Sequence, residues 1–265
     1  LQPCLPGDDA LLKRKRRFIE FSDAHPSLES LLESPPEPRP FEKNEVARDA
    51  LEDAILGTPG VFVVQGPPGT GKTHLATEVV CRYLARTPGG RVLVCSKEHF
   101  ALGHIRQKIA SGLDERGVAF RAYRSVSLSR LSRNAAEASD PWLGANVARD
   151  LGGREWSGDA RGWIPWQAAT AADHDGRLDG RARASATVFF CTTMDAAMVE
   201  FLDEDSFDLV IVEEAGKCYP SEILHAICLG RTALLIGDHL QLPPYQEKRT
   251  QQAVEAWSQL IAQTR

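Results

Sequence analysis

The 265-residue sequence lacks several features that would point to other classes of protein. No apolar run approaches the ~18 residues that a membrane-spanning helix needs, so we expect no membrane partner. The six cysteines form no C-x-x-C pair, and Cys81 and Cys95 sit in apolar segments. This pattern favours buried thiols in a reducing compartment over disulfides or zinc ligands. We therefore expect a cytoplasmic protein, or a nuclear one if the source is eukaryotic.

The sequence also lacks an excess of basic residues. The sequence has 31 Lys and Arg against 36 Asp and Glu, which gives a net charge of −5. This balance argues against a generally basic nucleic-acid-binding surface, although a local basic track remains compatible with it. With 43% hydrophobic and 25% charged residues, the composition is that of a globular chain long enough for one large domain or a domain with an insertion.

Residues 61–80, VFVVQGPPGTGKTHLATEVV, join an apolar strand pattern to a glycine-rich turn and then to a helical pattern. In a loop of the form G-x-x-x-x-G-K-[ST], backbone N–H groups and the start of the helix cradle a phosphate. Lys72 then reaches the β- and γ-phosphate oxygens, and the Thr73 hydroxyl faces Mg²⁺. A chance turn between core elements is the alternative, and the flanking strand and helix disfavour it. The matching residues are Gly66, Pro67, Pro68, Gly69, Thr70, Gly71, Lys72 and Thr73.

The first 40 residues differ in pattern from the rest of the chain. Residues 8–33 carry helical signals and include a basic run, Lys13 to Arg17, which either touches phosphate or forms a solvated helix face. The proline-rich stretch 34–40 cannot continue a helix. We therefore expect residues 1–40 to form a helical or stalk segment that ends in a linker.

From residue 41 onward, helix and strand patterns alternate. Short apolar strands without polar alternation are typical of a parallel sheet buried on both faces. The sequence thus predicts a doubly wound α/β domain, built from residues 41–110 and 186–265, with ligands at the carboxyl ends of the strands. The expected strands are 61–65, 91–95, 187–191, 208–212 and 232–236, and the expected helices are 45–56, 72–85, 100–110 and one from about 221.

Residues 111–185 form a segment of a different kind, rich in Gly, Arg and Ala and without a sustained strand pattern. We interpret this segment as an inserted accessory subdomain. Its tryptophans lie near arginines, so they either stack nucleic-acid bases or, as we favour, anchor a small core. These tryptophans are Trp142, Trp156, Trp163 and Trp166.

Polar residues follow two of the later strands. Glu213 and Glu214 come directly after the strand 208–212, where one acid can support Mg²⁺ and its neighbour can activate the water that attacks a γ-phosphate. A surface acidic pair at a helix start is the alternative. The segment GDHLQLPP, 237–244, follows the next strand and brings Gln241 toward the same site as a candidate γ-phosphate sensor.

These segments together resemble helicase motifs of superfamily 1B, in the branch of the nonsense-mediated-decay RNA helicase and its DNA-processing relatives. The motifs are QGPPGTGKT, VLVCSKEHFALGHI, FFCTTMDAA, DLVIVEEAGK and LLIGDHLQLPP, in order, within residues 41–245. The resemblance implies a RecA-like ATPase domain that grips single-stranded DNA or RNA. It assigns catalysis to Glu214, Lys72 and Gln241 and Mg²⁺ support to Thr73 and Glu213. The implied nucleic-acid contacts are Ser96, Lys97, His99, Thr192 and Thr193.

Three positions depart from the family pattern. Ala47 stands where an adenine-reading glutamine is usual, so adenine selectivity is open. Glu213 and Glu214 stand where the family usually has an Asp-Glu pair. Lys217 stands where the family usually has a glutamine, three residues after the base.

The resemblance also implies a second RecA-like domain that completes the ATP site. We expect the 265 residues to be one motor domain that hydrolyses ATP negligibly alone. Two alternatives stay open: a nucleotide-dependent clamp without hydrolysis, and an unrelated P-loop enzyme such as a small-molecule kinase.

Overall fold

The structure is a computed structural model. It describes residues 44–126, 140–144, 146, 186–195, 198, 207–238 and 240–241, with the single residues 40, 183 and 252. The predicted N-terminal segment, apart from Pro40, lies outside the described residues, as do most of the predicted insertion and three of its tryptophans, Trp156, Trp163 and Trp166. The elements are α3 (Glu45–Gly57), β1 (Gly60–Gln65), α4 (Lys72–Arg86), β2 (Val92–Ser96), α5 (His99–Glu115), β3 (Ala122–Arg124), β4 (Val188–Thr192), β5 (Phe207–Glu213), η1 (Ala215–Lys217), α12 (Pro220–Cys228) and β6 (Gly230–Gly237).

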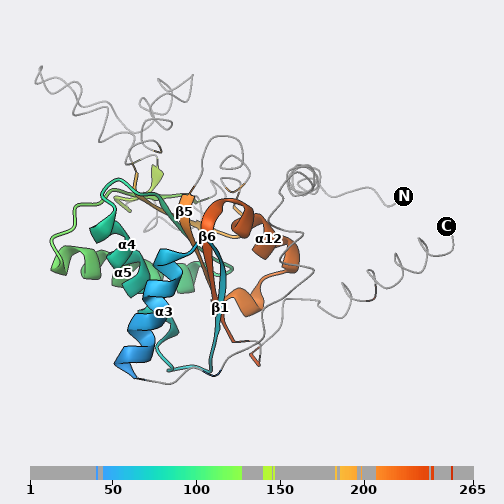
Figure 1. Ribbon diagram of the computed structural model, residues 1–265. Coiled ribbons are helices and arrows are strands. Elements are labelled where there is room, and N and C mark those ends of the chain that lie inside the picture. The colour runs from blue at the N-terminus through green and yellow to red at the C-terminus, as the bar shows by residue number, and fades with distance from the viewer. Residues whose placement is uncertain are drawn as a thin grey trace, which may run out of the picture.

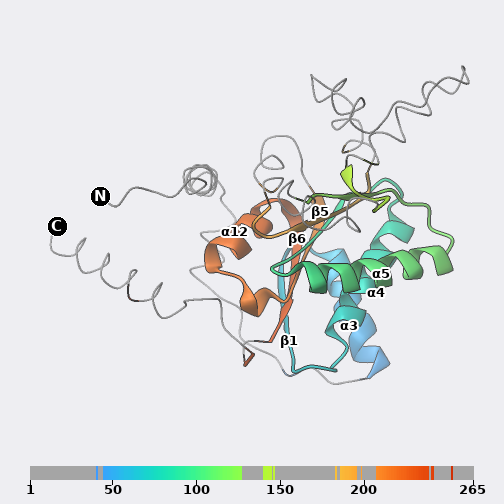
Figure 2. The same cartoon turned by 180° about the vertical axis from the view of Figure 1, so that it is seen from behind.

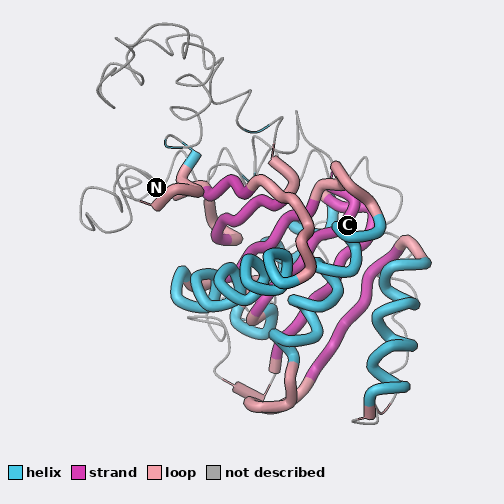
Figure 3. The backbone as a smooth tube through the Cα atoms, turned by 90° about the vertical axis from the view of Figure 1, so that its left-hand side faces the viewer, coloured by secondary structure: helices cyan, strands magenta, loops and turns pink. Residues whose placement is uncertain are grey.

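The strands form one parallel sheet in the order β1-β6-β5-β2-β4-β3. Helices α3, α4 and α5 lie on one side of this sheet and α12 on the other (Figures 1 and 2). Figure 3 shows the strands side by side between these helices. The prediction of a doubly wound α/β fold is confirmed, and all five strands expected from the sequence are present within two residues of their expected ends.

The core consists of two apolar clusters, one on each face of the sheet. One packs β-strand side chains such as Phe190 and Ile211 against α4 and α5, and the other packs Phe189 and Val210 against α12. Every residue of β2 and β4 is buried, which explains why these strands carry no polar alternation. Alternate residues of one strand therefore anchor both helical layers and fix the carboxyl edge of the sheet.

Two expectations about the sheet were wrong. Strand β3 lies inside the range 111–185 assigned to the insertion, and α5 continues into it as far as Glu115, so the sheet extends further than predicted. Strand β1 is not buried on both faces, because Val63 is 67% exposed.

Trp142 stacks on Phe190 of β4 with ring centroids 5.7 Å apart, which supports a packing role for this tryptophan.

No helix in the described part of the chain is both long and apolar enough to cross a membrane.

Candidate active site

The loop between β1 and α4 has the conformation that its glycines permit. Gly69 and Gly71 have φ angles of 78° and 89°, in the left-handed region that favours glycine. The Gly66 N–H donates to the Gly237 carbonyl at 3.2 Å, which ties the loop to the end of β6. No side chain caps the N-terminus of α4, so the first N–H groups of this 15-residue helix point into the loop. The loop and helix start therefore suit an anion.

Lys72 lies folded over the same loop. Its ammonium donates to the Gly66 carbonyl and, at 2.9 Å, to the Pro67 carbonyl. The Thr70 hydroxyl donates to the Pro67 carbonyl at 2.8 Å and stiffens the turn from the other side. These bonds hold the ammonium of Lys72 over the loop, and its contact with a phosphate stays a prediction.

Thr73 and Glu213 meet although 140 residues separate them in sequence. The Thr73 hydroxyl donates to one carboxylate oxygen of Glu213 at 2.6 Å. The other oxygen, Oε2, is buried and has no hydrogen-bond partner among the described residues. Burial raises the pKa of Glu213 above its usual range, the Thr73 bond opposes this rise, and Glu214 adds to it. A buried carboxylate oxygen without a partner, beside a hydroxyl, fits a divalent cation such as Mg²⁺.

Glu214 sits in a strained backbone position directly after β5. Its φ is 58°, the one positive φ of a non-glycine residue in the described ranges, and strain of this kind is frequent at functional sites. Its half-buried carboxylate lies 3.7 Å from the Lys217 ammonium, which also reaches Glu98 at 3.4 Å. Lys217 departs from the family pattern, and its link to Glu98 was not predicted because no sequence pattern indicates it.

Gln241 follows β6, which is the neighbour of β5 in the sheet. Its side-chain amide donates to Asp238 at 3.3 Å, and the Asp238 side chain also accepts from the Leu240 N–H at 3.0 Å. A Cβ added to Gly216 would meet the Asp238 carbonyl oxygen at 2.8 Å, so η1 and the end of β6 are in direct contact. The structure thus places η1 against the end of β6, and an approach of Gln241 to Glu214 stays a prediction.

A hollow of about 520 Å³ opens beside the phosphate loop on the side of α3. Asn44 caps α3 by accepting from the Ala47 N–H at 2.7 Å, and Ala47 itself does not line the hollow. Glu45 and Arg48 do line it, together with Gln65 of β1. These three residues were not predicted. For Arg48, the spacing of four residues from Asn44 on a predicted helix before the loop was a sequence signal.

The residues expected along a nucleic acid gather at the carboxyl ends of β2 and β4. Ser96 pairs with Thr192 in the sheet register, and the Thr193 N–H donates to the Ser96 carbonyl at 3.0 Å. The side chains of these three residues are buried. They therefore lie beneath the surface of this edge, and their contact with a strand stays a prediction.

Lys97 and Thr193 both bind one acid on α12. The Lys97 ammonium lies 2.5 Å from the Glu222 carboxylate, and the Thr193 hydroxyl donates to the same carboxylate at 3.1 Å. His99 begins α5 and is half-buried. Glu222, which is 5% exposed, was not predicted, although a glutamate within the apolar helix SEILHAIC was a sequence signal for a buried partner.

Sequence comparisons relate this chain to known proteins. The profile of a family described as "AAA domain" matches residues 42–141 and 174–247. Regulator of nonsense transcripts 1 of Caenorhabditis elegans is 30% identical over 221 residues, and ATP-dependent helicase NAM7 of Saccharomyces cerevisiae is 28% identical over 195 residues. These alignments cover 77% and 69% of this chain.

The chain spans only 18% of the length of each relative. An arterivirus nonstructural protein 10 helicase, solved in complex with DNA, aligns over 79% of this chain and 35% of its own, with 14% identity and a TM-score of 0.36, an overlap too low to support any argument. The family match covers well over half of the chain and includes both the phosphate loop and the acidic pair. The chain therefore belongs to the AAA-domain family of superfamily 1B helicases, of which it carries the RecA-like motor domain.

Proposed function

We propose that this domain binds ATP with Mg²⁺ and uses its hydrolysis to move along single-stranded DNA or RNA, together with a second RecA-like domain. The observation that carries the proposal is the contact between Thr73 and Glu213, which joins the phosphate loop to the acidic pair. The other carboxylate oxygen of Glu213 is buried and has no hydrogen-bond partner among the described residues. The yeast relative is an ATP-dependent helicase, which supports the same activity.

The site residues have separate roles in this proposal. Lys72 binds the β- and γ-phosphate oxygens, while Thr73 and Glu213 hold Mg²⁺, which neutralises charge that develops on those oxygens. Glu214 orients the attacking water and accepts its proton. Gln241 senses the γ-phosphate from the segment after β6, where its side-chain amide donates to Asp238.

The proposed path of the strand runs over the carboxyl ends of β2 and β4. Lys97 and His99 supply polar side chains there, and Ser96, Thr192 and Thr193 support the edge from below. Because the Lys217 ammonium lies between Glu214 and Glu98, this edge is linked to the candidate base. That link also favours a second candidate function, in which the ion pair restrains Glu214 and the domain acts as a nucleotide-dependent clamp without turnover.

The first test is ATP binding to the 265-residue chain by calorimetry, with Mg²⁺ and with EDTA. Lys72→Ala removes a charge-assisted contact worth about 1.5–3 kcal/mol, so affinity should fall at least about tenfold. Arg86→Gln is a suitable control, because it removes a positive charge from the far end of α4 where the side chain is 54% exposed. Equal affinity of the Lys72→Ala and Arg86→Gln variants would rule out the phosphate-loop assignment.

The second test is steady-state ATPase activity with and without single-stranded DNA or RNA, for this chain and for a longer chain that also contains a second RecA-like domain. An arginine supplied across such a domain interface contributes about 10³–10⁵ in rate. We therefore expect strand-stimulated turnover only in the longer chain. Binding without turnover in both chains would favour the clamp.

A further inference from the structure

Glu222 is a buried acid of α12, and both of its carboxylate oxygens have partners in other parts of the fold. One oxygen binds the Lys97 ammonium at 2.5 Å. The other accepts from the Thr193 hydroxyl at 3.1 Å and from the Tyr219 N–H at 3.3 Å. A carboxylate that is 5% exposed is costly to bury unless it is paired in this way. Glu222 therefore ties the ends of β2 and β4 to the start of α12.

The Lys97 ammonium has three N–H donors, and the structure accounts for two of its sides. One donor binds Glu222, and the Tyr219 ring covers another side with its centroid 4.8 Å from the nitrogen. No other described residue accepts from this ammonium, yet the Lys97 side chain is still 24% exposed. One N–H donor is thus available to a ligand at the surface.

Lys97 stands at the centre of the edge over which the proposed strand runs. It directly follows Ser96, the last residue of β2, which pairs in the sheet register with Thr192 of β4 on one side and with Glu213 of β5 on the other. The partner on α12 and the ring of Tyr219 hold the ammonium at this point, so its remaining donor has a fixed direction.

The pair of Lys97 and Glu222 is neutral as a unit. The nearest thiol, that of Cys218, adds no charge, because burial and the Glu222 carboxylate raise its pKa to about 11. A phosphate that meets Lys97 therefore gains a directed hydrogen bond but little net positive charge. Binding of a strand at this point should then release fewer salt ions than binding to an unpaired lysine.

We infer that Glu222 is a positioning residue for the single strand: it directs one donor of Lys97 to a backbone phosphate and neutralises the charge of that lysine. This inference rests on the proposed function, because it takes the strand to run over the ends of β2 and β4. Lys97 touches the strand, and Glu222 acts through Lys97.

The experiment measures the affinity of the 265-residue chain for a fluorescent oligothymidine by anisotropy over a series of salt concentrations. In Glu222→Gln the amide keeps the size of the side chain and can still accept from Thr193, but Lys97 is no longer neutralised. The plot of log affinity against log salt should become steeper by about 0.7, the value for one net charge on a single strand. At the high-salt end the affinity should be about threefold below that of the wild-type chain, because the ammonium is no longer held in place.

A double variant tests whether Glu222 acts through Lys97. Lys97→Met with Glu222→Gln has the net charge of the wild-type chain, so its salt slope should return to the wild-type value. Its affinity should nevertheless be about three- to tenfold lower at every salt concentration, because the directed donor is lost. Wild-type affinity in the double variant would show that Lys97 does not touch the strand and would overturn the inference.

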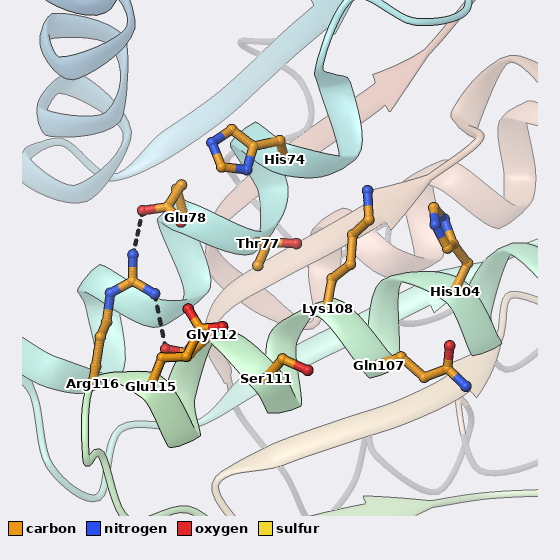
Figure 4. Close-up of a pocket in the computed structure, with 10 residues that line it drawn as sticks. All are labelled: His74, Thr77, Glu78, His104, Gln107, Lys108, Ser111, Gly112, Glu115 and Arg116. Carbon is orange, nitrogen blue, oxygen red and sulfur yellow. Dashed lines mark hydrogen bonds and ion pairs between the residues drawn. The ribbon is translucent and has the colours of Figure 1, made fainter.

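Glu78→Gln is the matched control, since it also removes a carboxylate from an ion pair. Glu78 of α4 binds Arg116 at 2.6 Å, and Arg116 also donates to the Gly112 carbonyl at 2.8 Å (Figure 4). This pair lies roughly 25 Å along the axis of α5 from His99, where that helix begins. Charges at such distances are largely screened, so the salt slope should not change. Urea denaturation of each variant measures its stability separately.

The outcomes separate this inference from the proposed function. An unchanged slope in Glu222→Gln, with strand binding intact, would make Glu222 a purely structural acid and overturn the inference alone. Failure of the wild-type chain to bind ATP, with the slopes as expected, would contradict the proposed function alone. Failure of the wild-type chain to bind the oligothymidine and an oligouridine would overturn both.

Discussion

Gly216 is a position where a single methyl group should disturb the candidate active site. A Cβ at this position would lie 2.8 Å from the Asp238 carbonyl oxygen and 3.2 Å from its carbonyl carbon. Ordinary contacts between such atoms lie at about 3.5 Å. The atom it meets belongs to the backbone, so neither side can yield by a simple rotamer change, and η1 must move away from the end of β6.

The expected change in the free energy of unfolding for Gly216→Ala follows from two opposing effects. Overpacking of this kind costs about 1–3 kcal/mol. Loss of glycine entropy in the unfolded chain returns about 0.4–1 kcal/mol. The net expectation is a free energy of unfolding lower by about 1–2 kcal/mol. Because η1 carries the residues that follow Glu214, nucleotide affinity should fall as well.

Gly103→Ala is the matched control, because an added Cβ at this position within α5 meets no atom within 4 Å. Alanine replaces glycine there at a helical position, so this variant should gain about 0.5–1 kcal/mol. Urea denaturation followed by circular dichroism measures both variants against the wild-type chain. A midpoint for Gly216→Ala equal to or above that of Gly103→Ala would refute the close contact between η1 and β6.

Four other changes have defined outcomes. Glu214→Gln should leave ATP binding within a few-fold and abolish turnover in a chain with both RecA-like domains, and full turnover by this variant would reverse our assignment of the base. Glu213→Asp should be mild, because it restores the acid usual in the family, and ATPase titrations with Mg²⁺ measure it. Lys217→Gln should release Glu214 from its ion pair and change the ratio of nucleotide affinities with and without a strand, while an unchanged ratio would remove the link through Glu98. Burial lowers the pKa of His225 to about 4 in the folded chain, below the ordinary value of about 6.5. The unfolded chain therefore binds more protons between these values, so stability should be complete above about pH 6.5 and fall below it by up to ~1.4 kcal/mol per pH unit; His225→Gln should flatten that slope in urea titrations.

The sheet was predictable because its signals are local. Five strands are short apolar runs, and the loop residues from Gly66 to Thr73 carry the spacing typical of a phosphate-binding loop. Thr73 and Glu213 were both expected to support Mg²⁺, and the structure brings them into contact, although the sequence did not indicate the hydrogen bond itself.

The features that the sequence did not predict depend on side chains that meet across distant elements. Strand β3 was missed because it has three residues and ends in Arg124, whose buried guanidinium pairs with Asp140 at 2.7 Å. An arginine does not look like a core residue until its partner is known. Glu222 was missed for the same reason, since its partners Lys97 and Thr193 lie 125 and 29 residues away.

Modification of the buried thiols can also be used to measure local opening of the domain. Cys81 lies in the apolar layer under α4 and α5, whereas Cys95, Cys191, Cys218 and Cys228 lie in the layer under α12. Burial raises the pKa of each of these five thiols, so the reactive thiolate is scarce as well as covered. Alkylating reagents should thus modify them only when a layer opens, and the order of modification should rank the local stabilities of the two sides of the sheet.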